Sequence, residues 1–397
     1  MSTPVPLKRV VSINPETLPE DTAASFEFQY VDIGAVGRGR LVEEPPTTAF
    51  GEAPSRARRL LRPGDTIVST VRTYLRAVLP IEKSGLVGST GFACLRPQRG
   101  LDPRFLGWWA QSDGLIEEVV ARSVGVSYPA INPSELGLIR FPMRPASEQR
   151  AIADYLDTET ARIDALIAKK RRLLALAEGR VRSALEASMR SGSWSPPSLS
   201  YLLAHRVSDG PHETPEFLDQ GIPFLSVDAF VDDSLSFSGC RFVSPEDHRR
   251  YSAKVKPRRG DVLMTKAAAI GRVALVQTDR EFNIWSPVAV LRANPELLRP
   301  EYLAHVLRSD DLQTQMELAA TSNTQQNLAM RDISSLRIPL PPLDEQARLA
   351  EVADDRLTLQ RALRGRMREQ ISRLEEHRQA LITAAVTGEL EVPGVAA

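Results

Sequence analysis

The chain has few of the residues that mark a secreted, membrane-bound or metal-binding protein. It has only two cysteines, Cys94 and Cys240, and neither has a partner at metal-ligand spacing. No apolar run approaches the length of a membrane span, and the N-terminus lacks the apolar stretch of a signal peptide. We therefore expect a cytoplasmic protein with reduced cysteines and no membrane partner.

Net charge is missing as well, because 50 basic residues balance 50 acidic ones. Only 7 of the basic residues are lysine, and arginine is the side chain that reads guanine edges and clamps phosphates. A GC-rich genome would give the same bias. The sequence also lacks a glycine-rich cofactor loop, a Walker loop and an Asn-Pro-Pro-Tyr or Asp-Pro-Pro-Tyr run. These absences count against an enzyme that acts alone and against a resident cofactor or metal.

The most informative feature that is present is an internal repeat. Asp32 aligns with Asp228, Gly64-Asp65 with Gly260-Asp261, and Leu95-Arg96 with Leu291-Arg292, each pair 196 residues apart. Glu148-Gln149 then aligns with Glu345-Gln346 at an offset of 197. This period is too long for a solenoid and fits two whole domains. We predict a pseudo-dimer, and duplex DNA is the usual ligand with two spaced half-sites.

Each half is predicted to hold a mixed α/β domain followed by a long helix. Apolar runs at residues 66–69 and 261–264 are entered through Gly-Asp turns, which is a strand signal. Helices are predicted over Pro103–Asp113 and Pro300–Asp310, each with proline at the first helical position. The two tryptophans of the first of these helices do not recur in the second copy, so we assign them to the core.

The long helices are the most legible part of the sequence. A proline-rich hinge precedes each one, and we expect Ser147 and Asp344 to be the N-caps, each followed by a glutamate that the helix dipole favours. Apolar residues then recur at alternating spacings of three and four, which predicts a coiled-coil seam. Both helices should end at matching glycines, Gly192 and Gly388.

The predicted fold class is α+β, with two similar α/β domains separated by two long antiparallel coiled-coil helices about a pseudo-two-fold axis. The predicted segments are a first domain (1–146), a first helix (147–192), a second domain (193–343), a second helix (344–391) and a tail (392–397). Roughly 40 helical residues at about 1.5 Å each give a spacer of about 60 Å. We expect the spacer to set the gap between the DNA sites that the two domains touch.

Several motifs resemble those of one known family. The helix beginnings at 142–150 (Pro-Met-Arg-Pro-Ala-Ser-Glu-Gln-Arg) and 339–348 (Pro-Leu-Pro-Pro-Leu-Asp-Glu-Gln-Ala-Arg) share a proline cluster and a Glu-Gln pair. The ending Ala385–Leu390 and the Asp-Gly-Pro-His-Glu-Thr-Pro opening at 209–215 belong to the same pattern. Over essentially its whole length the chain resembles the specificity subunit of a type I restriction-modification system. The first domain departs from the pattern, because it opens with Val11–Thr17 and lacks the Gly-Pro-His turn.

The resemblance implies a non-catalytic DNA-recognition subunit with two target-recognition domains. The implied partners are double-stranded DNA, two methyltransferase subunits and motor-nuclease subunits. S-adenosylmethionine, ATP and Mg are expected on those partner subunits, and this chain is expected to bind no cofactor. Because the two domains open differently, the resemblance implies a bipartite and asymmetric target.

Candidate DNA contacts follow the repeated Gly-Asp strands. They are Thr70, Arg72, Tyr74 and Arg76 in the first copy, and Lys266 and Arg272 in the second. Cations on a loop that leaves a strand, interleaved with an aromatic and small residues, suit phosphate and base-edge contact. The alternative is a solvated hairpin whose arginines pair with neighbouring carboxylates.

A second pair of candidate segments precedes the last strand of each domain. The candidates are Ser127 and Tyr128 in the first copy, and Thr324, Gln325, Gln326 and Asn327 in the second. Asn and Gln amides offer a donor and an acceptor together to the major-groove edge of adenine, although a polar loop also bonds its own backbone. His212 of the Gly-Pro-His turn could reach a phosphate or could serve the turn itself.

A function of a different class stays open at this point. A pseudo-dimeric coiled-coil scaffold for protein interaction, without DNA binding, would fit the zero net charge. The two hypotheses differ in what the paired domains should expose. DNA binding requires exposed cations on the loops of both domains, whereas the scaffold does not.

Overall fold

The computed structural model describes residues 3–125, 128–190, 196–320 and 327–395, with the backbone alone at 178 and 180–190. The chain divides into two compact units. The first comprises Met1–Arg171 with Arg368–Ala397, and the second comprises Arg172–Met367. Two long helices, α4 (Ala146–Arg190) and α10 (Leu343–Thr387), each contribute one part to each unit.

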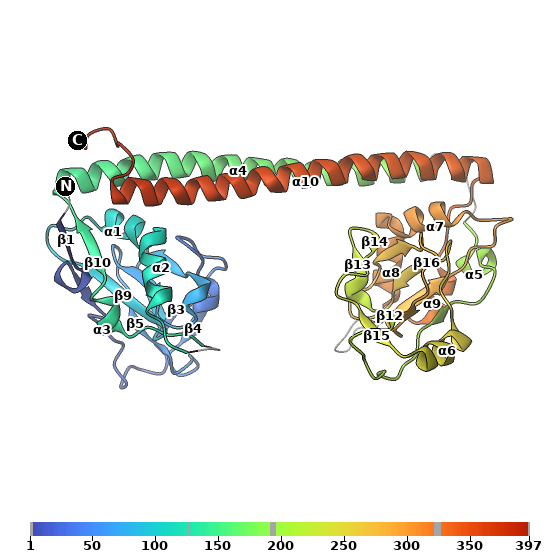
Figure 1. Ribbon diagram of the computed structural model, residues 1–397, viewed down its shortest axis with the longest axis horizontal. Coiled ribbons are helices and arrows are strands. Elements are labelled where there is room, and N and C mark those ends of the chain that lie inside the picture. Colours follow the sequence, from blue (N-terminus) through green and yellow to red (C-terminus); the bar gives the residue numbers. More distant parts are fainter. Residues whose placement is uncertain (1–2, 126–127, 191–195, 321–326, 396–397) are drawn as a thin grey trace. The chain divides into compact units, whose positions relative to one another are not determined.

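The first unit contains two four-stranded sheets and a short two-stranded one (Figure 1). One sheet has the antiparallel order β2 (Val11–Ile13), β9 (Phe92–Pro97), β6 (Thr66–Ser69), β7 (Val78–Pro80). The other has the order β4 (Thr47–Ala49), β3 (Glu27–Val31), β8 (Leu86–Ser89), β5 (Ala57–Leu60), in which β3 and β8 are parallel. Strands β1 (Thr3–Pro6) and β10 (Arg140–Met143) pair antiparallel.

The second unit repeats the first sheet. Its order is β11 (Ser208–Asp209), β19 (Val288–Leu291), β16 (Val262–Thr265), β17 (Val273–Leu275), again antiparallel. A three-stranded sheet has the order β15 (Arg241–Val243), β12 (Ile222–Leu225), β18 (Asn283–Ile284), with β12 and β18 parallel. A hairpin joins β13 (Phe230–Val231) to β14 (Ser234–Leu235). The sequence repeat is therefore a repeat of the fold, as predicted.

The Gly-Asp turns explain why these strands begin where they do. Gly64 and Gly260 have φ of +91° and +89°, which a residue without Cβ adopts readily. The aspartates that follow are buried and hold an arginine of the neighbouring strand. Asp65 Oδ1 lies 2.8 Å from Arg96 Nε, and Asp261 Oδ1 lies 2.7 Å from Arg292 Nε. Both predicted strands are confirmed, with every residue of β6 and β16 buried.

The predicted helix at Pro103 is in fact the first of two. Helix α1 (Pro103–Ala110) ends before α2 (Asp113–Ala121) begins, and the second unit has α7 (Pro300–Leu307) and α8 (Asp310–Ala319) in the same places. A serine causes the break each time, because the Ser112 and Ser309 hydroxyls accept the N–H groups of Leu115 and Leu312 and so cap the second helix. The remaining helical segments are short. They are η1 (Leu7–Arg9), η2 (Ile33–Ala35), η3 (Thr73–Leu75), α3 (Pro133–Leu136), α5 (Leu199–Leu202), η4 (Val227–Ala229), α6 (Pro245–Lys254) and α9 (Met330–Ser335).

The predicted N-caps of the long helices are wrong by a residue or two. Helix α4 begins at Ala146 and α10 at Leu343, so Ser147 and Asp344 lie inside the first turn. The carbonyl of Pro145 accepts the N–H of Gln149 at 3.0 Å, and that of Pro342 accepts the N–H of Gln346 at 2.9 Å. The carbonyl of each proline is therefore the first helical acceptor, and this explains why no polar cap is needed.

Antiparallel pairing of the long helices is seen within the first unit, where α4 and α10 run side by side (Figure 1). Asp164 Oδ1 lies 3.1 Å from Arg378 Nε, and Lys170 donates to Gln370 at 2.7 Å. Along α4 the partner number falls as the residue number rises, which only antiparallel helices give. Helix α10 ends as predicted, with Gly388 at φ +89° donating its N–H to Ala384. Gly192 lies outside the described residues.

The cores of the two units are separate, and each takes up part of a long helix. Ile152 and Leu156 of α4 and Ile382 and Val386 of α10 are buried in the first core. Leu349 of α10 is buried in the second. A search of the described helices finds none that is long and apolar enough to cross a membrane.

Candidate nucleic-acid interface

The loop after β6 in the first unit is rigid and presents three of the predicted residues. Arg72 and Arg76 lie at its ends with φ of +51° and +53°, and the turn of η3 lies between them. Thr73 is buried, with its hydroxyl 2.8 Å from that of Ser123 on the segment that follows α2. Two left-handed residues and a buried anchor hold one loop conformation, in which Arg72, Tyr74 and Arg76 are exposed.

The structure brings the two predicted segments of the first unit together. Val71 bridges to Ala130, and the guanidinium of Arg72 lies 5.1 Å above the ring of Tyr128. A cation over a tyrosine face is attracted by the negative face of the ring. Tyr128 remains 65% exposed, so this stacked pair lies at the surface. Ser127 lies outside the described residues.

Thr70 does not fit the prediction of a DNA contact. It is only 6% exposed, and its hydroxyl donates to the carbonyl of Gly91 at 2.9 Å. Its N–H donates to the same carbonyl at 2.8 Å. Thr70 therefore fixes the start of the loop from beneath instead of presenting itself to a ligand.

Lys266, the counterpart of Thr70, is a second correction. It is 8% exposed, and its ammonium lies 3.3 Å from Asp209 Oδ2. Asp209 is fully buried and also lies 2.6 Å from Lys254 Nζ and 3.2 Å from His212 Nε2. We call these four residues the Asp209 cluster. A buried carboxylate must be paired, and Lys266 is used for that pairing, so it is not a free cation at the surface.

The Asp209 cluster depends on a close approach of two backbones. A Cβ on Gly210 would lie 1.9 Å from the carbonyl oxygen of Ile284, so only glycine fits there. This explains the glycine of the Gly-Pro-His turn. The turn leaves the side chain of His212 69% exposed beside the buried carboxylate, where it could contact a phosphate.

Asn327, the described end of the second polar segment of this unit, lies beside the loop after β16. Asn327 is exposed and bridges to Ala267, and Leu328 donates its N–H to the carbonyl of Lys266 at 2.8 Å. Thr324, Gln325 and Gln326 lie outside the described residues. The two predicted segments are thus neighbours in both units, although they are far apart in sequence.

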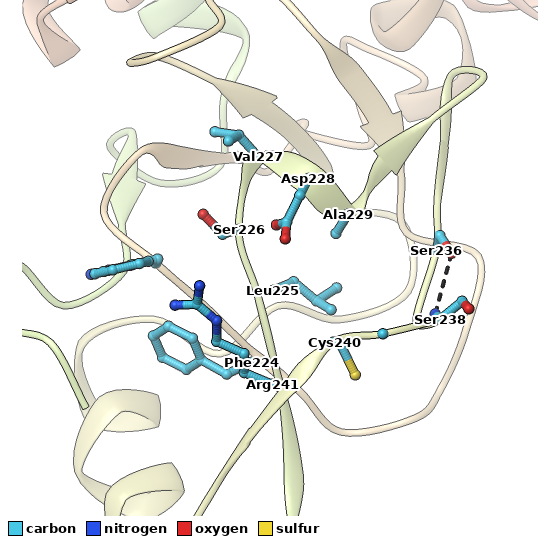
Figure 2. A pocket seen from close by; sticks show the side chains of 12 residues that line it. Phe224, Leu225, Ser226, Val227, Asp228, Ala229, Ser236, Ser238, Cys240 and Arg241 are labelled. Carbon is cyan, nitrogen blue, oxygen red and sulfur yellow. Dashed lines mark hydrogen bonds between the residues drawn. The ribbon is translucent and has the colours of Figure 1, made fainter. Parts of the chain in front are cut away.

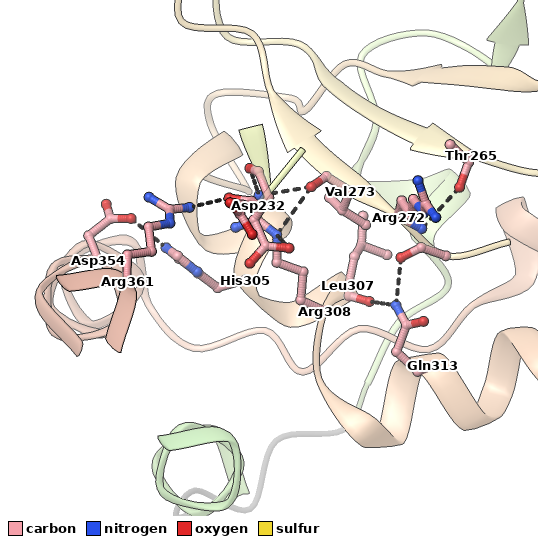
Figure 3. A network of polar contacts seen from close by, with 12 residues as sticks. Asp232, Thr265, Arg272, Val273, His305, Leu307, Arg308, Gln313, Asp354 and Arg361 are labelled. Carbon is pink, nitrogen blue, oxygen red and sulfur yellow. Dashed lines mark hydrogen bonds and ion pairs between the residues drawn. The ribbon is translucent and has the colours of Figure 1, made fainter. Parts of the chain in front are cut away.

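Each loop carries an arginine near its end, Arg76 in the first unit and Arg272 in the second, although the second loop closes one residue earlier. Both guanidinium groups are exposed, and among the described residues no carboxylate lies within ion-pair distance of either one. The N–H of Arg272 donates to Thr265 Oγ1 at 3.0 Å, and Gln313 donates to the neighbouring carbonyl of Gly271 at 2.9 Å (Figure 3). The backbone is therefore fixed while the charge stays available.

A pocket of about 300 Å³ in the second unit was not predicted (Figure 2). Ser226 and Asp228 line it, and the guanidinium of Arg241 lies beside it, 4.7 Å above the ring of Phe217. The internal repeat could have indicated this pocket, because Ser226 aligns with Tyr30 of the first unit, whose side chain is much larger.

A polar network fastens the second domain to α10 (Figure 3). His305 Nε2 lies 3.0 Å from Asp354 Oδ1, and Arg361 donates to the carbonyl of Asp232 at 2.8 Å. Burial lowers the pKa of His305, the charge of Arg308 lowers it further, and Asp354 opposes both. Trp108 holds the equivalent place in the first unit and donates to Asp157 at 2.8 Å, so it is a helix anchor and only half-buried, whereas Trp109 is buried as predicted.

Nucleophilic and metal chemistry find little support in the residues described. Burial and the neighbouring carboxylate of Asp65 together raise the pKa of the Cys94 thiol to about 12, so the thiol stays protonated at neutral pH. No group of three or more His, Cys, Asp or Glu side chains within the described ranges could hold a metal ion. What the geometry offers is two loops with exposed cations on equivalent strands.

The chain is similar to known proteins of one family. Residues 216–372 match the type I restriction modification DNA specificity domain. A chain from a study of complex assembly and conformational transition of the type I R-M system is 26% identical, with a TM-score of 0.74 and 98% of both chains covered. This chain is similar to the specificity subunits of type I restriction-modification systems.

Two specificity subunits of known enzymes are also similar. That of the type I restriction enzyme EcoBI from Escherichia coli is 22% identical over 304 residues, which span 70% of this chain and 64% of the EcoBI subunit. That of EcoKI from Escherichia coli strain K12 is 22% identical over 315 residues, or 75% of this chain and 67% of the EcoKI subunit. The resemblance stated from the sequence motifs is confirmed, while the individual DNA-contacting residues stay predictions.

Proposed function

We propose that this chain is the DNA sequence-specificity subunit of a type I restriction-modification complex and binds a bipartite, asymmetric site. One observation carries the proposal: the same loop follows the same strand in both units, and its side chains differ. In the first unit the loop reads Arg72-Thr-Tyr-Leu-Arg76, and in the second Ala268-Ala-Ile-Gly-Arg272. Both loops start with a left-handed residue, Arg72 and Ala268, and then differ in side chains and by one residue in length, as two readers of different sequences would.

The two ends of each loop have separate roles in this proposal. Arg76 and Arg272 both lie near the end of their loops and suit contact with phosphate, which positions the protein without reading sequence. The residues before them differ, and they would read the bases or the shape of the DNA. Asn327 beside Ala267 would add an amide to the second reading surface.

The chemistry would be done by partner subunits. Two methyltransferase subunits would supply S-adenosylmethionine, and motor-nuclease subunits would supply ATP and Mg, while this chain supplies only recognition. A neutral chain can serve a DNA-binding complex, because its partners contribute part of the phosphate contact. That the long helices set the gap between the half-sites stays a prediction.

The direct test is co-expression of the full chain with methyltransferase subunits encoded beside it, followed by sequencing of methylated bases. We expect one bipartite motif with two different halves. Arg76→Ala and Arg272→Ala should each reduce methylation without changing the motif, and Arg150→Ala, an exposed residue of α4, serves as the control. Methylation by an assembled complex at sites with no bipartite motif would contradict the proposal.

A further inference from the structure

The first unit exposes apolar side chains at the tip of its loop, where the second unit does not. Tyr74 and Leu75 are 55% and 43% exposed, and Val124 and Tyr128 of the adjoining segment are 81% and 65% exposed. An isolated exposed apolar residue needs no explanation. Four that come from two adjoining segments of one surface, beside unpaired arginines, indicate a binding surface.

We infer that Tyr74 and Leu75 form an apolar wedge that enters duplex DNA at a base step within the half-site read by the first unit. This inference rests on the proposed function, and it names the way in which one half-site is recognised. Proteins that insert apolar side chains between base pairs unstack the step and kink the duplex. The wedge would read how easily a step deforms, in addition to any base edge that it touches.

The rigidity of the loop supports this role. A wedge must hold its shape while the DNA deforms, and the loop is held by left-handed residues at both ends and by buried Thr73 between them. Leu75 donates its N–H to the carbonyl of Arg72 at 2.8 Å, and Arg76 donates to that of Thr73 at 3.0 Å. Left-handed backbone at a non-glycine residue is costly, and such residues concentrate at functional sites.

The charge around the wedge fits duplex DNA. Arg72 and Arg76 flank Tyr74 and Leu75, and the described residues place no carboxylate within ion-pair distance of these arginines. Arg72 is stacked on Tyr128, which keeps its guanidinium at the surface. One cation on each side of an apolar tip suits contact with the phosphates on each side of an opened base step.

The second unit supplies a built-in comparison. Ile270 aligns with Tyr74, but it is half-buried and packs against the core of its own unit. Gly271 aligns with Leu75 in the sequence, and the second loop is one residue shorter. The second loop has no apolar tip, so only one half-site should be opened.

A wedge requires an easily unstacked step in the target. Pyrimidine–purine steps unstack most easily, so we expect the half-site of the first unit to include a TA or CA/TG step. Replacing that step by a stiffer one should weaken binding about tenfold, the usual effect of one wrong base pair. The half-site of the second unit should carry no such requirement.

The experiment uses the full chain assembled with its methyltransferase subunits and a pool of randomised duplexes, from which the preferred site is selected. The adenine analogue 2-aminopurine, which brightens when it is unstacked, is then placed at each step of the selected site. The methyltransferase subunits would flip their target adenines, so those positions keep adenine. At the remaining steps we expect a several-fold rise in fluorescence at one step of one half-site. Tyr74→Ala should abolish that rise, whereas Tyr74→Phe and Ile270→Ala should keep it.

Three outcomes would overturn the wedge. In the first, no step brightens although a bipartite site is selected, which leaves the proposed function standing. In the second, Tyr74→Ala reduces capture of the methyltransferase subunit and leaves the fluorescence intact, which would make the tip a protein contact. In the third, the wild-type complex selects no sequence at all, and then the proposed function fails together with the wedge.

Discussion

His305 Nε2 lies 3.0 Å from Asp354 Oδ1, and this contact joins α7 to the long helix α10 in the second unit. The first unit makes the equivalent contact without a histidine, because Trp108 donates to Asp157 there. His305 is 5% exposed, and its Nδ1 has no hydrogen-bond partner within the described part of the chain. One of the two domain attachments therefore contains a histidine, which changes charge near neutral pH.

We predict that the second unit loses stability as the pH falls below about 6.5, the usual pKa of histidine. The pKa of His305 in the folded protein is lowered, first by burial and then by Arg308. The unfolded chain therefore binds the proton more readily, and acid favours unfolding. Asp354 and Asp233 also face this histidine and limit the effect. Urea titrations of wild type and His305→Gln at pH 7.5 and 5.5 would measure it, and an equal acid loss in both proteins would contradict the prediction.

The glutamine that follows the proline hinge should be essential to each unit. Gln149 accepts the N–H of Asp102 at 2.8 Å and donates to the carbonyls of Gly100 and Arg144. Gln346 makes the same three bonds, to Arg299, Leu297 and Pro341. Both side chains are fully buried, so alanine would leave backbone groups without partners.

We expect Gln149→Ala to lower the free energy of unfolding of the first unit by about 2 to 3 kcal/mol, since each orphaned buried group costs about 1 to 3 kcal/mol. Gln346→Ala should do the same to the second unit. Hydrogen exchange would show which unit is loosened, with Arg150→Ala as the neutral control. Protection lost equally from both units after a single substitution would count against two independent attachments.

The carboxylate of Asp209 should stabilise the second unit. Asp209→Asn would leave the buried ammonium of Lys266 without its counter-charge, and removing one member of a buried pair costs about 3 kcal/mol. A second substitution, Lys266→Met, should recover much of that loss, because the cation is then gone as well. Thermal melting of the single and double variants checks this. Failure of the second substitution to rescue would show that Lys254 or His212 dominates the Asp209 cluster.

Arg76→Ala and Arg272→Ala should weaken DNA binding in the same way. Each should lower the slope of log K against log salt by about 1, because one phosphate contact is lost. Neither should change the sequence preference. Fluorescence anisotropy with a labelled specific duplex, at a series of salt concentrations, measures the slope. A change of preferred sequence with an unchanged slope would assign these arginines to the bases instead.

Much of the fold could be predicted from the sequence, because local and repeated signals determine it. The Gly-Asp turns located β6 and β16, and the heptad pattern located the long helices. The N-caps were misplaced because Ser147 and Asp344 have the right chemistry one or two residues too late. The sequence could not reveal that a proline carbonyl already begins each helix.

The candidate site was predictable only in part, because burial depends on partners distant in sequence. Lys266 looked like a surface cation until Asp209 was found beneath it, brought there by the pairing of β11 with β19 and of β19 with β16. The same limit applied to Thr70 and Gly91. Arg76 and Arg272 are exposed, as a DNA contact requires, and their contact with DNA stays a prediction.

Arg72 and Ala268 share one backbone conformation, with φ of +51° and +66°, although their side chains have nothing in common. Beyond that first residue the loops diverge, because the N–H of Ser69 donates to Ala77 whereas that of Thr265 donates to Arg272, one residue earlier in the repeat. The strands on either side of the loop still pair in the same way in both units. Recognition could then change by exchange of the whole loop on an unaltered sheet, and transplanting that loop from one unit to the other would be the smallest step toward a new target.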